Sequence, residues 1–255
     1  SRHVSVSLGE TAKLSAPLVV HNFYVPAGDD IPDPALNEKF AHKLGFLDEM
    51  KVCEGLHPSE NQRHILVGDL NVAPHEHDVW SHKQLLKVVS HTPIEVEKLL
   101  AVQAQGNWLD VARERIAMSE KVYTWWSYRA ADWTVGDRGR RLDHIWVSKA
   151  LGSNVTDFQI ARTARGWERP SDHVPVTVTM EPPSPITGAA ASIIRVVPST
   201  LSRMTAPHPL ATMSSAGTKY CPPALLTRVS RRPWRSTVSA MIRAACSASR
   251  MSPTT

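Results

Sequence analysis

Acidic residues are missing from the last 74 residues of the sequence. All 24 Asp and Glu lie at or before Glu181, and residues 182–255 contain none. This tail holds nine of the 29 Lys and Arg, so the net charge is −4 in residues 1–181 and +9 in the tail. The net charge of +5 therefore reflects the tail, and it gives no reason to expect that the body binds nucleic acid through its overall charge.

The acid-free tail also lacks a sustained hydrophobic period. It contains ten of the 19 Pro and 21 Ser or Thr, and its bulky apolar residues are scattered singly. Such a composition buries too little apolar surface to offset the entropy lost on ordering. We therefore expect a folded domain in residues 1–181 and a disordered tail in residues 182–255. A shifted reading frame also removes acids abruptly, and we favour that origin over a genuine basic tail.

Cysteine is scarce and long apolar runs are absent. The three Cys have no CxxC or Cys/His spacing typical of zinc sites, and an odd, sparse count favours a reducing compartment, so we expect a cytoplasmic protein. No apolar run approaches the roughly 18 residues that span a bilayer, so we expect no membrane association. The sequence has no initial Met and opens on a strand-like alternation, so we expect it to begin inside a fold.

Strand patterns dominate residues 1–181. Val4–Leu8 alternates apolar and polar residues, and residues 18–25 form a second run after a short polar link, which predicts an antiparallel pair. Residues 64–71 are nearly all apolar until they end in polar side chains, as in a buried strand that delivers a functional group at its end. Further strands are expected at residues 123–126, 141–147, 155–160 and 172–179.

Helix patterns lie between these strands. Asp33-Pro34 is expected to open a helix whose apolar residues, Leu36, Phe40, Leu44 and Leu47, recur every three to four positions. Thr92-Pro93-Ile94-Glu95 is a capping box with Pro at the first helical position, and another helix is expected to start within residues 108–115. We predict an α/β fold, a layered sandwich of two mostly antiparallel β-sheets flanked by helices.

Three short segments place carboxylates beside strands: Gly-Asp-Leu-Asn at 68–71, Arg-Leu-Asp-His at 141–144 and Ser-Asp-His-Val-Pro-Val at 171–176. Carboxylate and amide oxygens hold hard divalent ions. An Asp–His pair polarises water or holds a phosphate oxygen, and a metal ion neutralises charge developing at phosphorus. Together the segments favour hydrolysis of a phosphodiester, although each alone is a weak signal.

In this order and spacing, the three segments resemble the signature of the endonuclease/exonuclease/phosphatase superfamily. Phe-Tyr-Val-Pro at 23–26 and the block from Tyr-Thr-Trp-Trp at 123–126 to Arg-Leu-Asp at 141–143 are most similar to exonuclease III-like AP endonucleases. The resemblance runs from about Arg2 to Met180. It implies a deoxyribonuclease I-like fold, Mg²⁺ with Mn²⁺ as a substitute, and a monomer that acts on double-stranded DNA with abasic sites or 3′ ends.

The resemblance also implies roles for single residues. Asp69 resembles the carboxylate that orients or deprotonates the attacking water. Asn71 is similar to the amide at the scissile phosphate and metal, and Asp172 to a carboxylate of the metal site, so the expected metal ligands are Asp69, Asn71 and Asp172.

The remaining catalytic roles go to three side chains. Tyr24 is similar to the phenol at the phosphate, Asp143 to the carboxylate that orients the site histidine, and His173 to the imidazole on the phosphate. The resemblance leaves Asp69 and His173 as joint candidates for the general base.

DNA contacts follow from the same resemblance. Trp125 and Leu142 resemble the apolar pocket for a flipped-out abasic sugar, whose extrusion costs little because no base is unstacked. Arg129, Arg138 and Arg140 are expected to contact phosphates. Of Trp125 and Trp126, one is expected to be a core residue, since neighbouring residues of a strand point to opposite faces.

The sequence departs from the family pattern in two places. Ala27 stands where relatives often have Asn or Gln, which removes one polar DNA contact. An early Trp-Asn strand and a later Gln-Glu-Thr-Lys-like strand, whose Glu is a principal metal ligand, are absent. We therefore expect an N-terminally truncated domain with impaired activity.

Three alternatives remain. His75-Glu76-His77-Asp78 contains metal-binding residue types, but we interpret it as a solvated loop because no helix aligns the ligands. A phosphatase or sphingomyelinase of the same superfamily shares the segments at 68–71 and 171–173. A non-catalytic DNA-binding remnant is compatible with the missing Glu strand.

Overall fold

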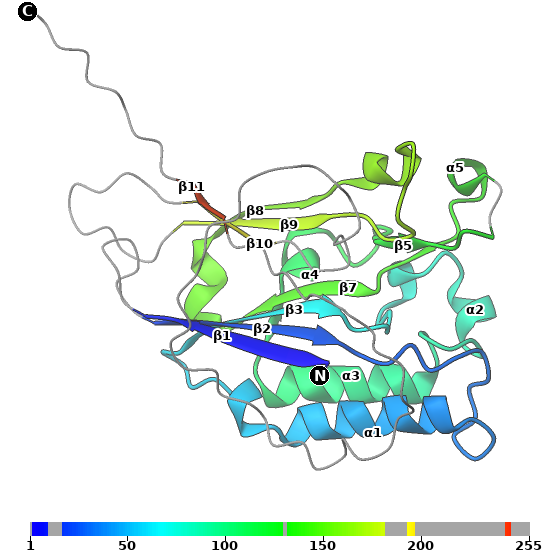
Figure 1. The fold of residues 1–255 in the computed structure, drawn as a ribbon, viewed down its shortest axis with the longest axis horizontal. Helices are drawn as coiled ribbons and strands as arrows, with labels where there is room; N and C mark the ends of the chain where they lie inside the picture. The colour runs from blue at the N-terminus through cyan, green and yellow to red at the C-terminus, as the bar shows by residue number, and fades with distance from the viewer. Residues whose placement is uncertain (1, 10–16, 130–131, 182–192, 197–242, 246–255) are drawn as a thin grey trace, which may run out of the picture.

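The computed structural model describes residues 2–9, 17–129 and 132–181, together with the backbone of residues 193–196 and 243–245. The described part of the chain contains two larger β-sheets, a two-stranded ribbon, a pair of long helices and several short ones. Figure 1 shows the helices α1 and α3 on one face of the first sheet and the second sheet over its other face. The predicted layered α/β sandwich of mostly antiparallel sheets is confirmed.

The first sheet has five strands in the order β1-β2-β3-β7-β4. Their bounds are His3–Leu8, Leu18–Tyr24, Arg63–Asp69, Asp143–Val147 and Leu109–Asp110, in that spatial order. β1 pairs with β2 in the predicted antiparallel hairpin, β2 runs parallel to β3, and β7 is antiparallel to both β3 and β4. The carboxyl ends of β2 and β3 therefore lie beside the amino end of β7.

The second sheet is antiparallel throughout, in the order β11-β10-β9-β8. β8 is Val155–Ile160 and β9 is Val176–Met180, while β10, Ile193–Val196, and β11, Arg243–Ala245, come from the region predicted as a tail. The rest of that region lies outside the described residues, so its predicted disorder is not tested. A two-stranded ribbon joins β5, Trp125–Trp126, to β6, Gly139–Arg140.

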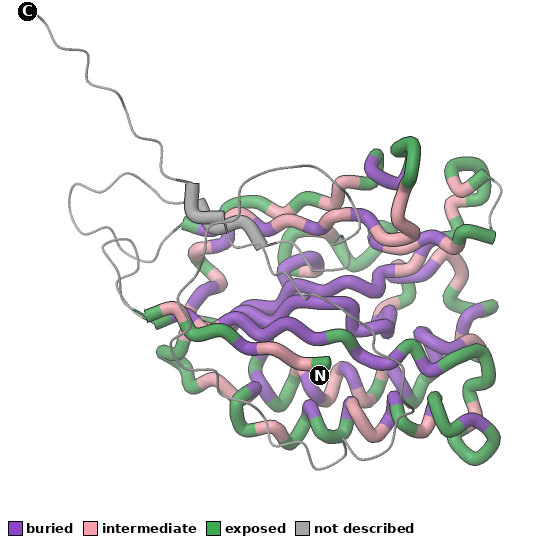
Figure 2. Tube along the Cα trace, viewed as in Figure 1, coloured by how far each residue is buried: buried purple, intermediate pink, exposed green. Residues whose placement is uncertain are grey.

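Two apolar clusters hold the layers together, one between the two sheets and one between the first sheet and the helices. Figure 2 shows the buried residues concentrated along β2, β3 and β7. Between the sheets, β2, β3 and β7 contribute Val20, Val67 and Ile145, which pack with Val176 and Val178 of β9. On the helix side, the cluster contains Phe23, Leu47, Leu66, Leu99 and Trp146 among others. This double burial explains why residues 65–68, just before Asp69, form a continuous apolar run.

The two long helices are α1, Glu38–Val52, and α3, Pro93–Gln105. The start predicted for α1 at Asp33-Pro34 is wrong by four residues. Asn37 is the N-cap, because its side-chain oxygen accepts hydrogen bonds from the backbone of Lys39 and Phe40. For α3 the predicted capping box is confirmed, with Thr92 at the cap and Glu95 three residues later.

Short helices fill the connections. They are α2, His82–Leu85; α4, Val111–Arg115; and α5, Trp133–Gly136, with 3₁₀ turns at Glu54–Leu56, Glu76–Asp78, Lys149–Asn154 and Arg162–Gly166. The predicted helix start within residues 108–115 is α4, capped by the Asp110 side chain. None of the helices in the described part of the chain has the length and apolar character needed to cross a bilayer.

Three histidines, which we call the histidine row, lie side by side on β1, β2 and β3. His3 Nε2 is 3.2 Å from His21 Nδ1, and His21 Nε2 is 3.2 Å from His64 Nδ1. Burial lowers the pKa of His3 to about 4, and burial with the neighbouring His3 and His64 lowers that of His21 to about 3. The row is therefore neutral at physiological pH and links three strands through ring nitrogens.

Cys53 follows α1 and is partly buried against the helix-side cluster. Its position beside the core agrees with its prediction as a small core residue.

Candidate active site

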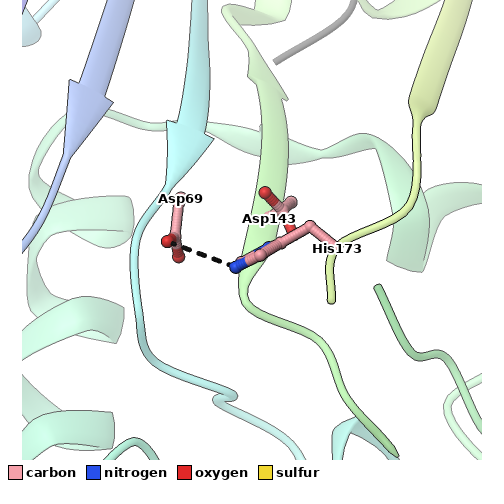
Figure 3. A group of neighbouring side chains, drawn as sticks. All are labelled: Asp69, Asp143 and His173. Carbon is pink, nitrogen blue, oxygen red and sulfur yellow. Dashed lines mark hydrogen bonds and ion pairs between the residues drawn. The ribbon is translucent and has the colours of Figure 1, made fainter. Parts of the chain in front are cut away.

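The candidate site forms where β2, β3 and β7 end together. In the sheet register Tyr24 of β2 is opposite Asp69 of β3, and Asp69 is opposite Asp143 of β7. Asp69 and Asp143 are 4% and 3% exposed, which is rare for carboxylates without a charged or hydrogen-bonded partner. His173 reaches the two carboxylates from the segment that precedes β9 (Figure 3). The three segments chosen from the sequence therefore converge.

Gly68 permits the close approach of β2 to the end of β3. Its φ is +141°, a conformation that only glycine adopts readily. A Cβ at this position would lie 2.8 Å from the Phe23 carbonyl carbon, and closer still to its oxygen. Gly68 thus lets β3 stay paired with β2 up to Asp69, whose carboxylate lies at the end of the sheet.

Asn71 turns the chain immediately after Asp69. It has a left-handed φ of +53°, and its backbone N–H donates to Asp69 Oδ1 at 3.0 Å. Its side-chain Nδ2 donates to the Val25 carbonyl at 2.9 Å, which ties this turn to the segment after Tyr24. The side chain is buried and is oriented by its hydrogen bond to Val25, while the backbone of Asn71 is tied to Asp69.

Asp143 and His173 form a hydrogen-bonded pair. His173 Nδ1 lies 2.7 Å from Asp143 Oδ2, and Nε2 lies 3.8 Å from Asp69 Oδ2 on the opposite side of the ring. The imidazole is held between two carboxylates, as Figure 3 shows. The pair has the geometry that an orienting role of Asp143 requires, and that role stays a prediction.

The charged groups of the site shift one another's pKa values. Burial alone lowers the pKa of His173, but the charge and hydrogen bond of Asp143 and the charges of Asp69 and Asp172 outweigh it and raise the value to about 10. Burial raises the pKa of Asp69 to about 7, against the opposing charge of His173. At neutral pH the site thus combines a cationic imidazole with a carboxylate close to its own titration point.

Thr124 is a member of the site that the sequence did not single out. Its side chain is fully buried, and its hydroxyl oxygen accepts hydrogen bonds from the backbone N–H groups of Leu142 and Asp143, both at 3.0 Å. Its backbone carbonyl accepts from Val174. Thr124 therefore fixes the start of β7 and the segment after His173. In the sequence, the one signal for Thr124 is its place as a polar residue among the aromatic residues 123–126.

Asp172 lies beside the aromatic ribbon. Its Oδ2 accepts the Trp125 indole N–H at 3.0 Å, and its backbone carbonyl accepts from Trp126. Trp125 is half-buried, whereas Trp126 is 1% exposed and packs with Tyr123 and Val174. One of the two tryptophans is thus a core residue, as the strand alternation predicted.

Tyr24 is the most exposed of the predicted catalytic residues, at 49%. Burial and the charge of Asp69 raise the pKa of its phenol, and the Arg2 guanidinium lies 5.1 Å from the ring centroid. The phenol therefore keeps its proton and is available as a donor at the rim of the site.

The residues predicted to contact DNA differ in how far they are buried. Arg129 is exposed, and Arg138 is exposed with its guanidinium 4.8 Å from the Trp80 ring centroid. Arg140 is half-buried, since it donates to the Val89 carbonyl and the Ser90 hydroxyl and lies 5.3 Å from the Trp125 ring centroid. Leu142 is 5% exposed and belongs to the apolar cluster against which Trp125 packs. The two residues predicted for the pocket are therefore neighbours.

Among the residues that the structure describes, Asp69, Asp143 and His173 each place a ligand-type atom within 4.8 Å of the others. The two carboxylates suit a hard divalent cation, whereas the protonated His173 imidazole has no lone pair for one. Asp143 Oδ1 is buried without a hydrogen-bond partner, which leaves one carboxylate oxygen for an ion. Asp172, a predicted ligand, lies outside this group, so its ligation stays a prediction.

The segment His75-Glu76-His77-Asp78 has a structural role. Asp78 is fully buried and accepts from Arg141, with Nη2 at 2.8 Å, and also from Arg113. Arg141 in turn donates to Asp110 at 2.8 Å. This buried network anchors the loop after β3 to the start of β7. The interpretation of the segment as a solvated loop is therefore wrong for Asp78, which is buried in a 3₁₀ turn.

Comparison with known proteins agrees with the geometry. The model of the endonuclease/exonuclease/phosphatase family matches residues 9–173. Exodeoxyribonuclease III of Haemophilus influenzae is 29% identical over 165 residues, covering 62% of this chain and 60% of that protein. DNA repair nuclease APEX1 of Danio rerio is 36% identical over 116 residues, covering 45% of this chain and 35% of that protein.

A solved structure, an AP endonuclease from Archaeoglobus fulgidus, matches with a TM-score of 0.58 and 28% identity over 64% of this chain and 61% of that one. The chain thus spans about 60% of the length of exodeoxyribonuclease III. Fold, site and sequence match agree, and the chain belongs to the endonuclease/exonuclease/phosphatase family.

Proposed function

We propose that this protein is a Mg²⁺-dependent phosphodiester hydrolase of DNA repair, of the exodeoxyribonuclease III and AP endonuclease type. The observation that carries the proposal is the convergence of Asp69, Asp143 and His173 at one end of the sheets, with Asn71 fixed beside them. Two carboxylates around a histidine, next to a buried amide, suit attack by water on a phosphate group.

Each side chain has a role that follows from its surroundings. The His173 imidazolium, oriented by Asp143, holds an anionic phosphate oxygen through Nε2–H. Asp69 takes the proton of the attacking water, because its carboxylate faces His173 Nε2 at 3.8 Å, next to where the imidazolium would hold the phosphate. Tyr24, at the rim, donates its phenolic hydrogen to a second phosphate oxygen. This division of labour favours Asp69 over His173 as the base.

The metal ligands in this proposal are Asp69, Asn71 and Asp172, with Asp143 Oδ1 as a further oxygen. Mg²⁺, or Mn²⁺ in its place, supplies positive charge that stabilises the charge developing on the phosphate oxygens. The residues present are oxygen donors of the kind that such ions prefer, which supports the assignment.

The substrate class follows from the relatives and from the aromatic ribbon. Two of the relatives are named as a DNA repair nuclease and an exodeoxyribonuclease. Trp125 and Leu142, which share one apolar cluster, receive the abasic sugar, and Arg129, Arg138 and Arg140 contact phosphates. The proposed partner is double-stranded DNA with abasic sites or 3′ ends, bound by a monomer in the cytoplasm.

We expect incision by the 255-residue chain to be slow. A motif with the principal metal-ligating Glu of the family is absent from the sequence, and a hard ion held by fewer protein oxygens binds weakly. The assay should therefore use single-turnover conditions, with micromolar enzyme in excess over the substrate.

The test compares three labelled substrates in Mg²⁺: a duplex with one abasic analogue, the matched intact duplex, and an inositol phosphate. We expect slow incision at the abasic position, trimming of 3′ ends in the intact duplex, and no release of inorganic phosphate from the inositol phosphate. Preferential release of inorganic phosphate from the inositol phosphate would instead favour a phosphatase of the same superfamily. Binding of the abasic duplex without any incision would indicate a non-catalytic remnant.

A further inference from the structure

Lys43 of α1 is a buried cation directly behind the candidate site. Its side chain is 0% exposed, and burial lowers the pKa of its ammonium against the raising effect of Glu95. Lysine is almost never fully buried without partners that satisfy its charge and its three N–H donors. The partners of Lys43 therefore indicate what it is there to hold.

The ammonium has three contacts, and two of them are loop carbonyls. Nζ donates to the Asn71 carbonyl at 2.8 Å and to the Ala27 carbonyl at 3.2 Å, and it forms an ion pair with Glu95 Oε1 at 2.5 Å. Asn71 ends the turn after Asp69, and Ala27 lies three residues after Tyr24. One cation thus joins the two loops that carry predicted catalytic residues.

Glu95 gives this cation a rigid anchor. It is fully buried at the N-terminus of α3, where Oε2 accepts from the Thr92 hydroxyl at 2.6 Å and from the Thr92 backbone at 3.1 Å. The Ser90 backbone N–H donates to both carboxylate oxygens at 3.0 Å. The capping box of α3 therefore holds the counter-ion of Lys43 in one position.

The loops themselves are shaped to accept Lys43. Gly28 has a φ of +91°, and a Cβ there would lie 2.9 Å from Lys43 Cδ, so the loop after Tyr24 closes tightly on the lysine stem. Asn71 is held at a left-handed φ of +53°, a conformation that Asn adopts more readily than most residues but that still needs surroundings to fix it. A bond to its carbonyl from a fixed cation is one such constraint.

We propose that Lys43 is a positioning residue, which fixes the Asp69–Asn71 turn and the Tyr24 loop relative to each other by donating to the Asn71 and Ala27 carbonyls. The effect on metal binding rests on the proposed function, because Asp69 and Asn71 are the proposed ligands. The effect on loop order does not, because it follows from the two hydrogen bonds alone.

The test substitutes Lys43→Met, which keeps the length of the stem and removes the donors. Outer partners of metal ligands typically contribute 10–100-fold in metal affinity, so we expect Mn²⁺ affinity, measured by calorimetry, to fall at least tenfold. Amide hydrogen exchange should become faster in residues 69–72 and 25–28. Because the variant also leaves Glu95 buried without its cation, its stability will fall.

Two further variants separate positioning from stability. Lys98→Met removes an exposed ion pair with Asp48 that also joins α1 to α3, so it should change neither readout. The double variant Lys43→Met/Glu95→Gln removes both buried charges, so its stability should recover while the Mn²⁺ affinity stays low and exchange in the two loops stays fast.

Two results would overturn the proposal: unchanged exchange in both loops of Lys43→Met, or recovery of wild-type exchange and affinity in the double variant. If the unaltered chain binds no Mn²⁺, the proposed metal site fails, and the exchange data alone decide the role of Lys43.

Discussion

Substituting Gly68 by Ala should be among the most damaging single-methyl changes in this protein. The new Cβ would lie 2.8 Å from the Phe23 carbonyl carbon and 3.0 Å from its nitrogen, both backbone atoms of the neighbouring strand. The strand cannot move away without breaking the β2–β3 ladder, whose register runs from Leu18 to Tyr24. The φ of +141° is also unfavourable for any residue with a Cβ.

The expected loss can be estimated from these two effects. Holding a non-glycine residue in such a conformation costs about 1–3 kcal/mol, and forcing an extra carbon into packed surroundings costs about another 1–3 kcal/mol. We expect the free energy of unfolding in urea to fall by about 2–6 kcal/mol, a large part of the roughly 5–15 kcal/mol available to a domain.

Gly45→Ala is the matched control, because it adds the same methyl group within α1. A Cβ at Gly45 meets nothing within 4 Å, and Ala is favoured over Gly in helices by about 1 kcal/mol, so this variant should be slightly more stable than the unaltered chain. A loss of less than about 0.5 kcal/mol in the free energy of unfolding of Gly68→Ala would refute the reasoning, because β2 and β3 would then accommodate a Cβ at this position.

Two further predictions concern charge and stability. The pKa values of the histidine row lie below 6.5 in the folded protein. The contribution of the row to the free energy of unfolding is therefore complete above about pH 6.5 and is lost as the pH falls, because only the unfolded chain then takes up protons. Between pH 6.5 and 5 the free energy of unfolding should drop by about 2 kcal/mol less in His21→Gln than in the unaltered chain. An equal slope in urea titrations at several pH values would contradict this. Asp78→Ala leaves Arg141 buried without one of its two partners and should cost about 3–5 kcal/mol. Asp48→Ala, which breaks an exposed pair with Lys98, should cost less than about 1 kcal/mol, and similar losses in the two variants would count against the buried network.

The sequence predicted the features that depend on local patterns. Asp69 follows an apolar run of the kind that forms a buried strand. Its carboxylate could therefore be placed at the end of that strand, where the site lies. The capping box at Thr92 and the β1–β2 hairpin have signatures within a few residues, and both are confirmed. The convergence of Asp69, Asp143 and His173 came from the resemblance to a family and not from spacing.

Features that depend on distant partners could not be predicted. Lys43 is 28 residues from Asn71, whose carbonyl it binds, and lies in a helix where lysine is ordinarily solvated. The pairing of Asp78 with Arg141 spans 63 residues, and nothing local marks either residue as buried. The start of α1 was misplaced because Asp33-Pro34 is a valid helix start by composition, and only tertiary structure selects Asn37 as the cap.

The central claim is that Asp69 acts in phosphodiester hydrolysis, and the Asp69→Asn variant tests it most directly. The change keeps the shape of the side chain and removes the charge that accepts a proton or holds the ion. Under single-turnover conditions on an abasic duplex, we expect the incision rate to fall by about 10²–10⁴-fold while the affinity for the duplex changes less than threefold. A variant that keeps a tenth or more of the rate would contradict the assignment of the site.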